Sequence, residues 1–337
     1  MEKRLVELDA LRGLAALSVV LFHFTTQFER LNGHRGSLPF YVPWGSYGVH
    51  LFFGISGFVI FMTLRRIERP LDFLVSRFSR LFPAYWAAIL LTSVIVVLGG
   101  ELTLQQPLLV ILANFTMLQE LVHIPSVDGV YWTLQVELAF YAIMFSAFLL
   151  RILDRIEFLL GWVFLKWLWW LFPNFSYTLG AILVQQYCAL FVIGICCYRI
   201  FSKETQARKD LCVIVFALLT VAVVDGPKEV LVASAVAAVL LLFSVGRLGL
   251  LRWPPLVWIG FISYTLYLLH QNIGWTVIRN LELLGVSASI AVSSALIVSL
   301  VLASCVTLLV ERPAMRIIRN SYRQWRAVRA VRANAGV

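Results

Sequence analysis

Long apolar runs, separated by short polar or charged breaks, recur along the whole chain. A helix needs about 20 apolar residues to cross a bilayer, and no segment has the alternating pattern of a membrane β-strand. Because backbone groups in lipid must be paired within each segment, this pattern predicts an all-α, polytopic membrane helical bundle. We expect about ten transmembrane helices, with cores near residues 8–28, 47–65, 82–99, 132–150, 157–172, 180–200, 211–225, 229–246, 256–278 and 286–310.

The segment 157–172 is the weakest predicted span, because it is short and contains Lys166. If it lay along the membrane interface, where Trp is favoured, every later span would reverse its direction. The distribution of cations favours ten spans. With both termini cytoplasmic, 23 of the 28 Lys and Arg residues lie on the inner side, as the positive-inside rule requires.

Composition and charge exclude a soluble protein, since 61% of the residues are apolar and only 14% are charged. The net charge of +10 arises mainly from the inner loops and from the end of the chain, where Arg recurs every three or four positions. That spacing predicts an amphipathic helix on anionic membrane lipids. We therefore expect one membrane domain, 1–312, and a basic cytoplasmic tail, 313–337, with no nucleic-acid partner.

The five cysteines all lie in apolar stretches and follow neither a disulfide framework nor a zinc-ligand spacing. We interpret them as packing residues, because free Cys behaves as a small hydrophobic side chain. The first apolar segment has no small-residue cleavage site after a short apolar core, which indicates a retained span.

Ionisable residues inside the predicted spans are candidates for function, because a charge in lipid is costly unless it is paired or hydrated. Arg12 and His23 are eleven residues apart, so they share one helix face and are separated by about 16 Å along it. Estimated depths place His23, Glu137 and His270 together in the outer half of the membrane. This coincidence predicts one polar pocket, although each residue alone fits a local helix contact, and two His with one Glu are a weak signal for a metal. We expect no metal.

Two further groups of polar residues lie outside the apolar cores. Arg77 and Arg80 are three residues apart in an inner loop, hence neighbours on one helical face. Arg is suited to bidentate phosphate recognition, but basic inner loops also serve topology and lipid contact. On the outer side, five residues are candidates for lining an acceptor groove, with solvated loop residues as the alternative interpretation: His34, His50, His123, Glu120 and Asp128.

The segment LDALRGLAALSVVLFHF (8–24) resembles the opening motif of the acyltransferase family 3 membrane proteins, in which an Arg and a His are separated by ten residues. The resemblance continues through nearly the whole chain, in the same order as in that family. The further blocks are GVHLFFGISGFVI (48–60), RFSRLFPAYW (77–86), YWTLQVELAFY (131–141), SYTLYLLHQ (263–271) and ERP (311–313). Three positions depart from the usual family pattern, namely His50, Gly54 and Thr133.

The resemblance implies transfer of an acyl group, commonly acetyl, from cytoplasmic acyl-CoA to hydroxyls of surface sugars, in a bacterial plasma (inner) membrane. In this expectation, the donor phosphates bind at the inner mouth and the thioester reaches the far end of the first helix. His23 is the candidate general base, Glu137 orients it, and an acyl-histidine intermediate stays open as an alternative. The expected sites are catalytic His23, Glu137 and His270; donor-binding Arg12, Arg77 and Arg80; and acceptor-binding Trp132, Tyr264, Tyr267, Gln271 and His50.

Two other functional classes compete with this expectation. Intramembrane His and Glu also serve proton relays, so a proton-coupled transporter is the main alternative, although no inverted repeat is visible. A non-catalytic membrane scaffold is disfavoured by charges placed deep in lipid. We expect the acceptor to be a polysaccharide or lipid-linked glycan, with a small secreted metabolite as the second choice.

Overall fold

The computed structural model describes residues 5–172, 175–203 and 207–334, and these residues form helices and connecting turns without a strand. Lys3, Arg4 and the last three residues of the predicted tail lie outside the described residues. The helices of nine or more residues are α1 Val6–Leu21, α3 Gly48–Leu64, α4 Pro70–Leu98, α6 Trp132–Leu149, α7 Ile156–Phe164, α10 Cys188–Ser202, α11 Ala207–Val224, α12 Pro227–Ser244, α13 Pro254–Leu269, α14 Gln271–Leu283, α15 Ala288–Val306 and α16 Arg312–Asn334. Shorter helices are α2 Phe28–Leu31, α5 Leu108–Asn114, α8 Lys166–Leu171 and α9 Tyr177–Ile182.

The all-α membrane bundle expected from the sequence is what the structure shows, with six described helical segments long and apolar enough to cross a bilayer. These segments are Val6–Leu31, Pro43–Leu64, Pro70–Leu98, Gly129–Leu149, Pro227–Ser244 and Ala288–Arg329. Two more apolar helices, Cys188–Ser202 and Pro254–Leu269, are shorter than 18 residues. The count of ten spans and the cytoplasmic position of both termini stay predictions.

Several predicted spans differ in detail from the observed helices. The third begins at Pro70 instead of residue 82, so the basic segment predicted as an inner loop is helical. The predicted span 157–172 is divided into α7 and α8, and at the division the buried Lys166 turns inward to the partly exposed carboxylate of Asp225. The spans predicted at 180–200 and 256–278 are each interrupted, the second at His270.

At two helix crossings in the bundle, glycines allow the backbones of the two helices to touch. At the crossing of α1 and α13, a Cβ on Gly260 would lie 1.8 Å from the carbonyl oxygen of Asp9. At the crossing of α3 and α10, a Cβ on Gly194 would lie 1.9 Å from the carbonyl oxygen of Gly54, and Gly57 meets the backbone of Phe191 in the same way. Small residues allow this close approach, which gives dispersion contacts between backbones in a membrane bundle.

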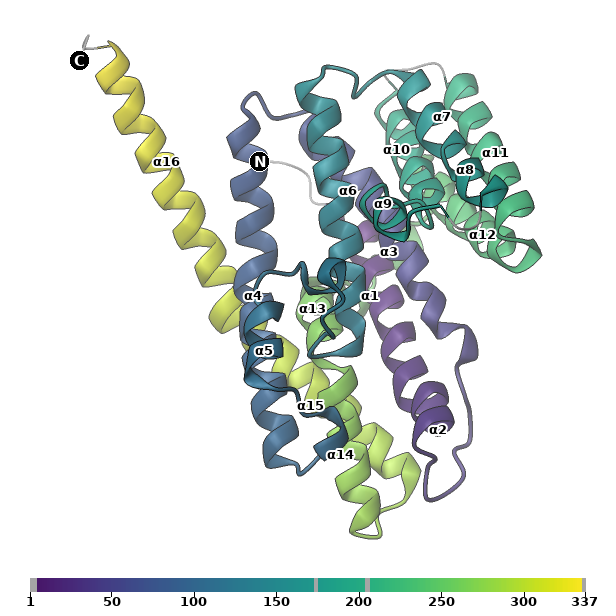
Figure 1. Cartoon of the computed structure of the whole chain (residues 1–337), viewed down its shortest axis with the longest axis vertical. Coiled ribbons are helices and arrows are strands. Elements are labelled where there is room, and N and C mark those ends of the chain that lie inside the picture. The colour runs from purple at the N-terminus through teal and green to yellow at the C-terminus, as the bar shows by residue number, and fades with distance from the viewer. Residues whose placement is uncertain (1–4, 173–174, 204–206, 335–337) are drawn as a thin grey trace.

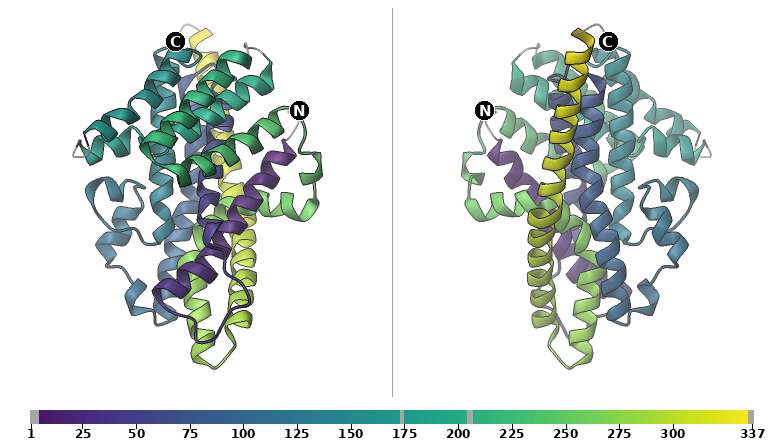
Figure 2. Two further views of the ribbon diagram at one scale, coloured as in Figure 1. Left: turned by 90° about the vertical axis from the view of Figure 1, so that its right-hand side faces the viewer. Right: turned by 90° about the vertical axis from the view of Figure 1, so that its left-hand side faces the viewer.

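The basic end of the chain forms a long helix that continues α15. A π-helical segment, Thr307–Glu311, joins α15 to α16 without a break, so the predicted boundary at 312/313 falls inside a continuous helix. Figure 2 shows α16 running beside the first half of α4. Asp72 of α4 accepts hydrogen bonds from Tyr322 (2.7 Å) and Arg326 (3.0 Å), which fixes the two helices together.

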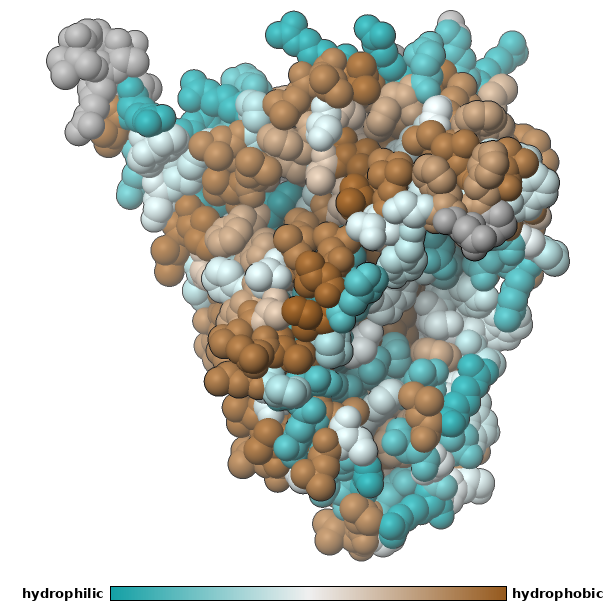
Figure 3. Space-filling view, in the orientation of Figure 1, coloured by the Kyte–Doolittle hydropathy of each residue, from teal (hydrophilic) through white to brown (hydrophobic). Residues whose placement is uncertain are grey.

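The surface has the division expected of a membrane protein. In Figure 3 hydrophobic side chains cover much of the face over α4 and α5, whereas hydrophilic side chains gather along the upper edge. Figure 1 shows that the lower ends of α4 and α15 extend well below the lower end of α6. The segments between α4 and α6 therefore fold back into the molecule, and α6 starts inside it.

Candidate functional site

Five helices, α1, α3, α4, α6 and α13, enclose a cavity of about 110 Å³, which has room for several water molecules. Its apolar wall comes mainly from α3, including Phe52 and Phe53. The polar side chains that line it are Arg12, Ser56, Arg77, Arg80, Thr133, Glu137, Tyr141, Ser263, Tyr264 and Tyr267. We call it the arginine cavity.

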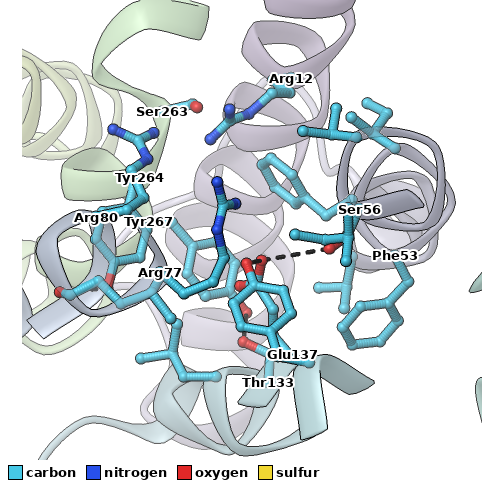
Figure 4. A pocket seen from close by; sticks show the side chains of 18 residues that line it. Arg12, Phe53, Ser56, Arg77, Arg80, Thr133, Glu137, Ser263, Tyr264 and Tyr267 are labelled. Atoms are coloured by element: carbon cyan, nitrogen blue, oxygen red, sulfur yellow. Dashed lines mark hydrogen bonds between the residues drawn. The ribbon is translucent and has the colours of Figure 1, made fainter. Parts of the chain in front are cut away.

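Three guanidinium groups converge on one side of this cavity (Figure 4), although Arg12 is far from the other two in sequence. Arg80 is paired with Glu311, and its guanidinium lies 5.4 Å from the ring centre of Tyr264. Arg77 lies 5.8 Å from the ring of Tyr141, and its buried Nε has no hydrogen-bond partner among the described residues. With Glu311 beside Arg80, three cations face two carboxylates, Glu137 and Glu311, which leaves a net positive charge at the cavity. Such an excess of half-buried positive charge favours binding of an anion.

Glu137 lies in the arginine cavity and not beside the histidines, which corrects the depth estimated from the sequence. Its carboxylate accepts hydrogen bonds from Tyr141 and from Ser56, the latter at 3.4 Å. Among the described residues, it makes no hydrogen bond with His23 or His270. The estimate failed because it assumed that α6 begins at the outer membrane surface, whereas α6 begins inside the molecule.

The two histidines form a pair on the other side of Tyr267. His23 Nδ1 and His270 Nε2 are 3.0 Å apart, and the ring centres are separated by 4.9 Å. His270 is fully buried, whereas His23 is half-buried. The structure therefore joins two residues that are 247 positions apart in sequence.

Backbone carbonyls determine which nitrogen of each imidazole carries the proton. His270 Nδ1 faces the carbonyl oxygens of Tyr267 at 2.8 Å and Leu266 at 3.2 Å, which only accept, so this nitrogen is the donor. In the neutral ring, His270 Nε2 then accepts from His23 Nδ1, which also faces the Val19 carbonyl at 3.0 Å. The remaining nitrogen, His23 Nε2, makes no hydrogen bond with a described residue and is not buried. It therefore has an accessible lone pair.

A π-helical segment, Phe22–Gln27, sets the position of His23 at the end of α1. Such segments are rare and occur frequently at functional sites. Its wider turns release backbone carbonyls, and the carbonyl of His23 accepts a hydrogen bond from the indole of Trp275 at 3.0 Å. The carbonyl of Phe24 likewise accepts from the buried ring of His34 at 3.0 Å. The predicted loop residue His34 is thus part of the support of this segment.

The arginine cavity does not extend to the histidine pair, so the path expected from the donor phosphates to His23 along the first helix is interrupted. Tyr267 lines the cavity, and its ring centre lies 5.7 Å from that of His270. Phe52 packs against the same tyrosine at 5.8 Å. These two rings separate the arginines from the imidazoles.

The five predicted acceptor-binding residues are not in one place. Tyr264 and Tyr267 line the arginine cavity, but their hydroxyls are engaged, with the carbonyl of Leu81 (2.9 Å) and with Thr133 (3.0 Å). The three others lie elsewhere. Trp132 packs against Tyr187, Gln271 packs against Gly129, and His50 pairs with Glu229 at 3.3 Å in a different cavity.

Some polar residues of these sites were not predicted. Ser56 and Tyr141 bind Glu137, and Glu311 binds Arg80, yet only their place inside apolar blocks marked them in the sequence. Lys166 and Asp225 form a pair across 59 positions that no local pattern indicates. Among the described residues, no group of three or more His, Cys, Asp or Glu side chains is arranged to hold a metal ion.

Comparison with known proteins gives one finding on relationship. The model of a family described as an acyltransferase domain, the acyltransferase 3 family, matches residues 5–310, which is nearly the whole chain. The same comparisons found no match to a curated protein or to a solved structure.

Proposed function

Since this chain belongs to the acyltransferase 3 family and is a membrane acyltransferase, we propose that it transfers an acyl group from cytoplasmic acyl-CoA to a hydroxyl of a glycan. We expect the acyl group to be acetyl. The glycan is extracytoplasmic or lipid-linked, and the protein lies in a bacterial plasma membrane. One observation carries this proposal. Three guanidinium groups lie in one cavity, and a single layer of aromatic rings separates that cavity from the imidazole of His23, which has an accessible lone pair.

The arginine cavity suits the phosphates of the donor. Acyl-CoA carries several negative charges at its nucleotide end, and these cannot enter lipid. Arg12, Arg77 and Arg80 supply planar donors that fit phosphate oxygens, and an incoming anion would neutralise the cationic excess of the lining. The thioester end would then extend past Phe52 and Tyr267, whose side chains must rotate to let it reach His23.

His23 is the proposed general base. Its Nε2 removes the proton of the acceptor hydroxyl as that oxygen attacks the thioester carbonyl. Collapse of the tetrahedral intermediate breaks the C–S bond, and the imidazolium returns the proton to the leaving thiolate. The products are the acyl ester and free CoA. His270 and the Val19 carbonyl hold the imidazole in the required tautomer, a role that the sequence had assigned to Glu137.

An acyl-histidine route uses the same lone pair in a different order. In that route His23 Nε2 attacks the thioester first, CoA leaves, and the acceptor hydroxyl then displaces the histidine. Incubating the protein with labelled acetyl-CoA without acceptor separates the two routes. A labelled His23 peptide, found by mass spectrometry and lost on adding acceptor, identifies the covalent route.

The experiment that tests the proposal uses the full chain reconstituted in liposomes with acetyl-CoA on one side. We expect release of free CoA thiol and transfer of labelled acetyl to oligosaccharides from the envelope of the producing cells. A proton-coupled transporter would instead move solute without cleaving the thioester. Accumulation of intact substrate with no free thiol would overturn the proposal.

A further inference from the structure

A second cavity, of about 380 Å³, lies between α3, α10, α11 and α12 and is larger than the arginine cavity. Its polar lining consists of His50, Gln186, Tyr187, Asp225 and Glu229. Within the described part of the chain, these residues form no hydrogen bond or ion pair with the arginines or the histidine pair. Asp225 and Glu229 flank the turn between α11 and α12, which the charge distribution predicts on the outer side.

A strained break in the helical backbone forms one wall of this cavity. Between α9 and α10 the chain leaves the helix, and Val184 adopts a left-handed conformation with φ of 54°. This conformation is rare and costly for a β-branched residue. Non-helical backbone in a membrane protein persists only where protein buries it or where it lines a hydrated cavity.

A fully buried lysine, Lys166, stabilises the non-helical backbone at this break. Lys166 Nζ donates to the carbonyl oxygens of Gln185 (3.3 Å) and Gln186 (3.1 Å) and pairs with Asp225 at 2.9 Å. Burying an ammonium group costs several kcal/mol unless it is paired and hydrogen-bonded. The polar cavity is therefore a built feature of the fold and not a packing gap.

Both carboxylates of the cavity have partners within the protein. Asp225 is neutralised by Lys166, and Glu229 accepts from Tyr47 at 3.4 Å and pairs with His50 at 3.3 Å. A cation entering the cavity would compete with these partners. A neutral ligand with many hydroxyls can use the spare carboxylate lone pairs without breaking them.

Open polar atoms and aromatic faces complete the lining. The Tyr187 hydroxyl makes no hydrogen bond with a described residue and is not buried, and the side chain of Asp225 is 23% exposed, so both are accessible from the cavity. Near the cavity, Trp44 stacks on Tyr47 with ring centres 5.9 Å apart and is 59% exposed. Aromatic faces beside hydrogen-bonding groups suit a sugar ring, which has an apolar C–H face and a rim of hydroxyls.

We propose that this second cavity binds a neutral sugar unit of the acceptor glycan and positions the chain for acylation; this inference rests on the proposed function. Phe53 lines the arginine cavity and packs against Tyr187 at 4.8 Å, so the two cavities share one aromatic wall.

The test measures acceptor and donor kinetics separately in the full-length protein. The probe is the oligosaccharide pool released by mild acid from the envelope of the producing cells, with labelled acetyl-CoA as donor. Glu229→Gln keeps the shape of the side chain and removes its charge, and Tyr187→Phe removes a single hydroxyl. We expect the KM for the oligosaccharides to rise about tenfold and fivefold, as lost hydrogen bonds predict, while the KM for acetyl-CoA changes less than twofold.

Glu157→Gln is the matched control, because Glu157 is an exposed carboxylate on α7 outside both cavities. Its two KM values should equal those of the wild type. If the wild type transfers acetyl and Glu229→Gln and Tyr187→Phe have unchanged KM for the oligosaccharides, the sugar site is wrong and the proposed function stands.

Equilibrium dialysis of the same oligosaccharide pool tests sugar binding when the wild type shows no transferase activity. If the wild type cleaves no thioester, the proposed function fails, and retention of sugar by the wild type but not by Glu229→Gln still supports the cavity as a sugar site. Equal retention by both proteins, or binding that is displaced by sodium ions, would overturn the inference.

Discussion

His23 and His270 are hydrogen-bonded through Nδ1 and Nε2 at 3.0 Å, with the far nitrogen of His270 held by two backbone carbonyls. The pair connects the end of α1 to the kink between α13 and α14. Because carbonyls cannot donate, the proton positions follow from geometry, and His23 is left with one accessible basic nitrogen. This relationship gives the two histidines different roles.

Replacement of His23 should stop the chemistry and preserve donor binding. His23→Ala removes the proposed base, for which losses of about 10²–10⁴ in rate are typical. Acetyl transfer and acetyl-CoA binding, measured on the same preparation, check this expectation. His123→Asn, at an exposed left-handed position, is the control and should retain full activity. Full transfer by His23→Ala would exclude His23 as base or nucleophile.

Replacement of His270 should reveal a positioning role. In His270→Gln the amide oxygen can accept from His23 Nδ1, so partial activity is expected, whereas His270→Leu offers no acceptor and should lose transfer almost fully. The KM for acetyl-CoA should be similar in both variants. Equal loss of kcat in the two variants would indicate that His270 acts directly on the substrate.

Removal of the paired arginines should weaken the donor complex. Each hydrogen bond to a charged group contributes about 1.5–3 kcal/mol, so Arg77→Ala with Arg80→Ala should raise the KM for acetyl-CoA by at least about tenfold. Arg155→Ala, which removes an exposed cation, is the control. An unchanged donor KM in the double variant would place the phosphates elsewhere.

The crossing of α1 and α13 should tolerate no added side chain. Gly260→Ala would place a methyl group 1.8 Å from the Asp9 carbonyl, so the helices must separate and thermal stability in detergent should fall. Gly161→Ala has no neighbour within 4 Å and should be neutral or stabilising, since Ala favours helix by about 1 kcal/mol. Equal melting temperatures for Gly260→Ala and the wild type would contradict the crossing.

The carboxyl group of Asp128 should make stability depend on pH. It lies just outside the span Gly129–Leu149, and burial raises its pKa from 3.8 to about 7, against the lowering effect of hydrogen bonds from the Asn272 and Val130 amides. The folded state therefore binds the proton more tightly than the unfolded state, and stability falls as pH rises from about 4 to 7. Melting at pH 5 and pH 8 should show a smaller difference for Asp128→Asn than for the wild type.

The apolar runs correctly predicted an all-helical membrane bundle, because the backbone groups of each segment in lipid must form hydrogen bonds within that segment. Arg12 and His23 do lie on one helix that extends from Val6 to Leu31. The π-helical turns at Phe22–Gln27 carry no signal in the apolar pattern, since they depend on donors from Trp275 and His34.

Partners from distant segments account for what the sequence did not predict. The depth of Glu137 could not be predicted, because the sequence does not show that the chain before α6 folds back into the molecule. The break before α10 depends on Lys166 and Asp225, and the position of Arg80 depends on Glu311 at the other end of the chain. Such long-range ion pairs follow from tertiary packing, which a linear pattern does not contain.

The unbroken helix from α15 through α16 has a mechanical consequence for the donor site. Glu311 sits at its π-helical joint and binds Arg80, while Asp72 fastens the far portion to α4. The helix therefore connects the basic end of the chain mechanically to the arginines that we propose bind the donor phosphates. A force applied to that end would reach the cavity in which we propose that the acyl donor is held.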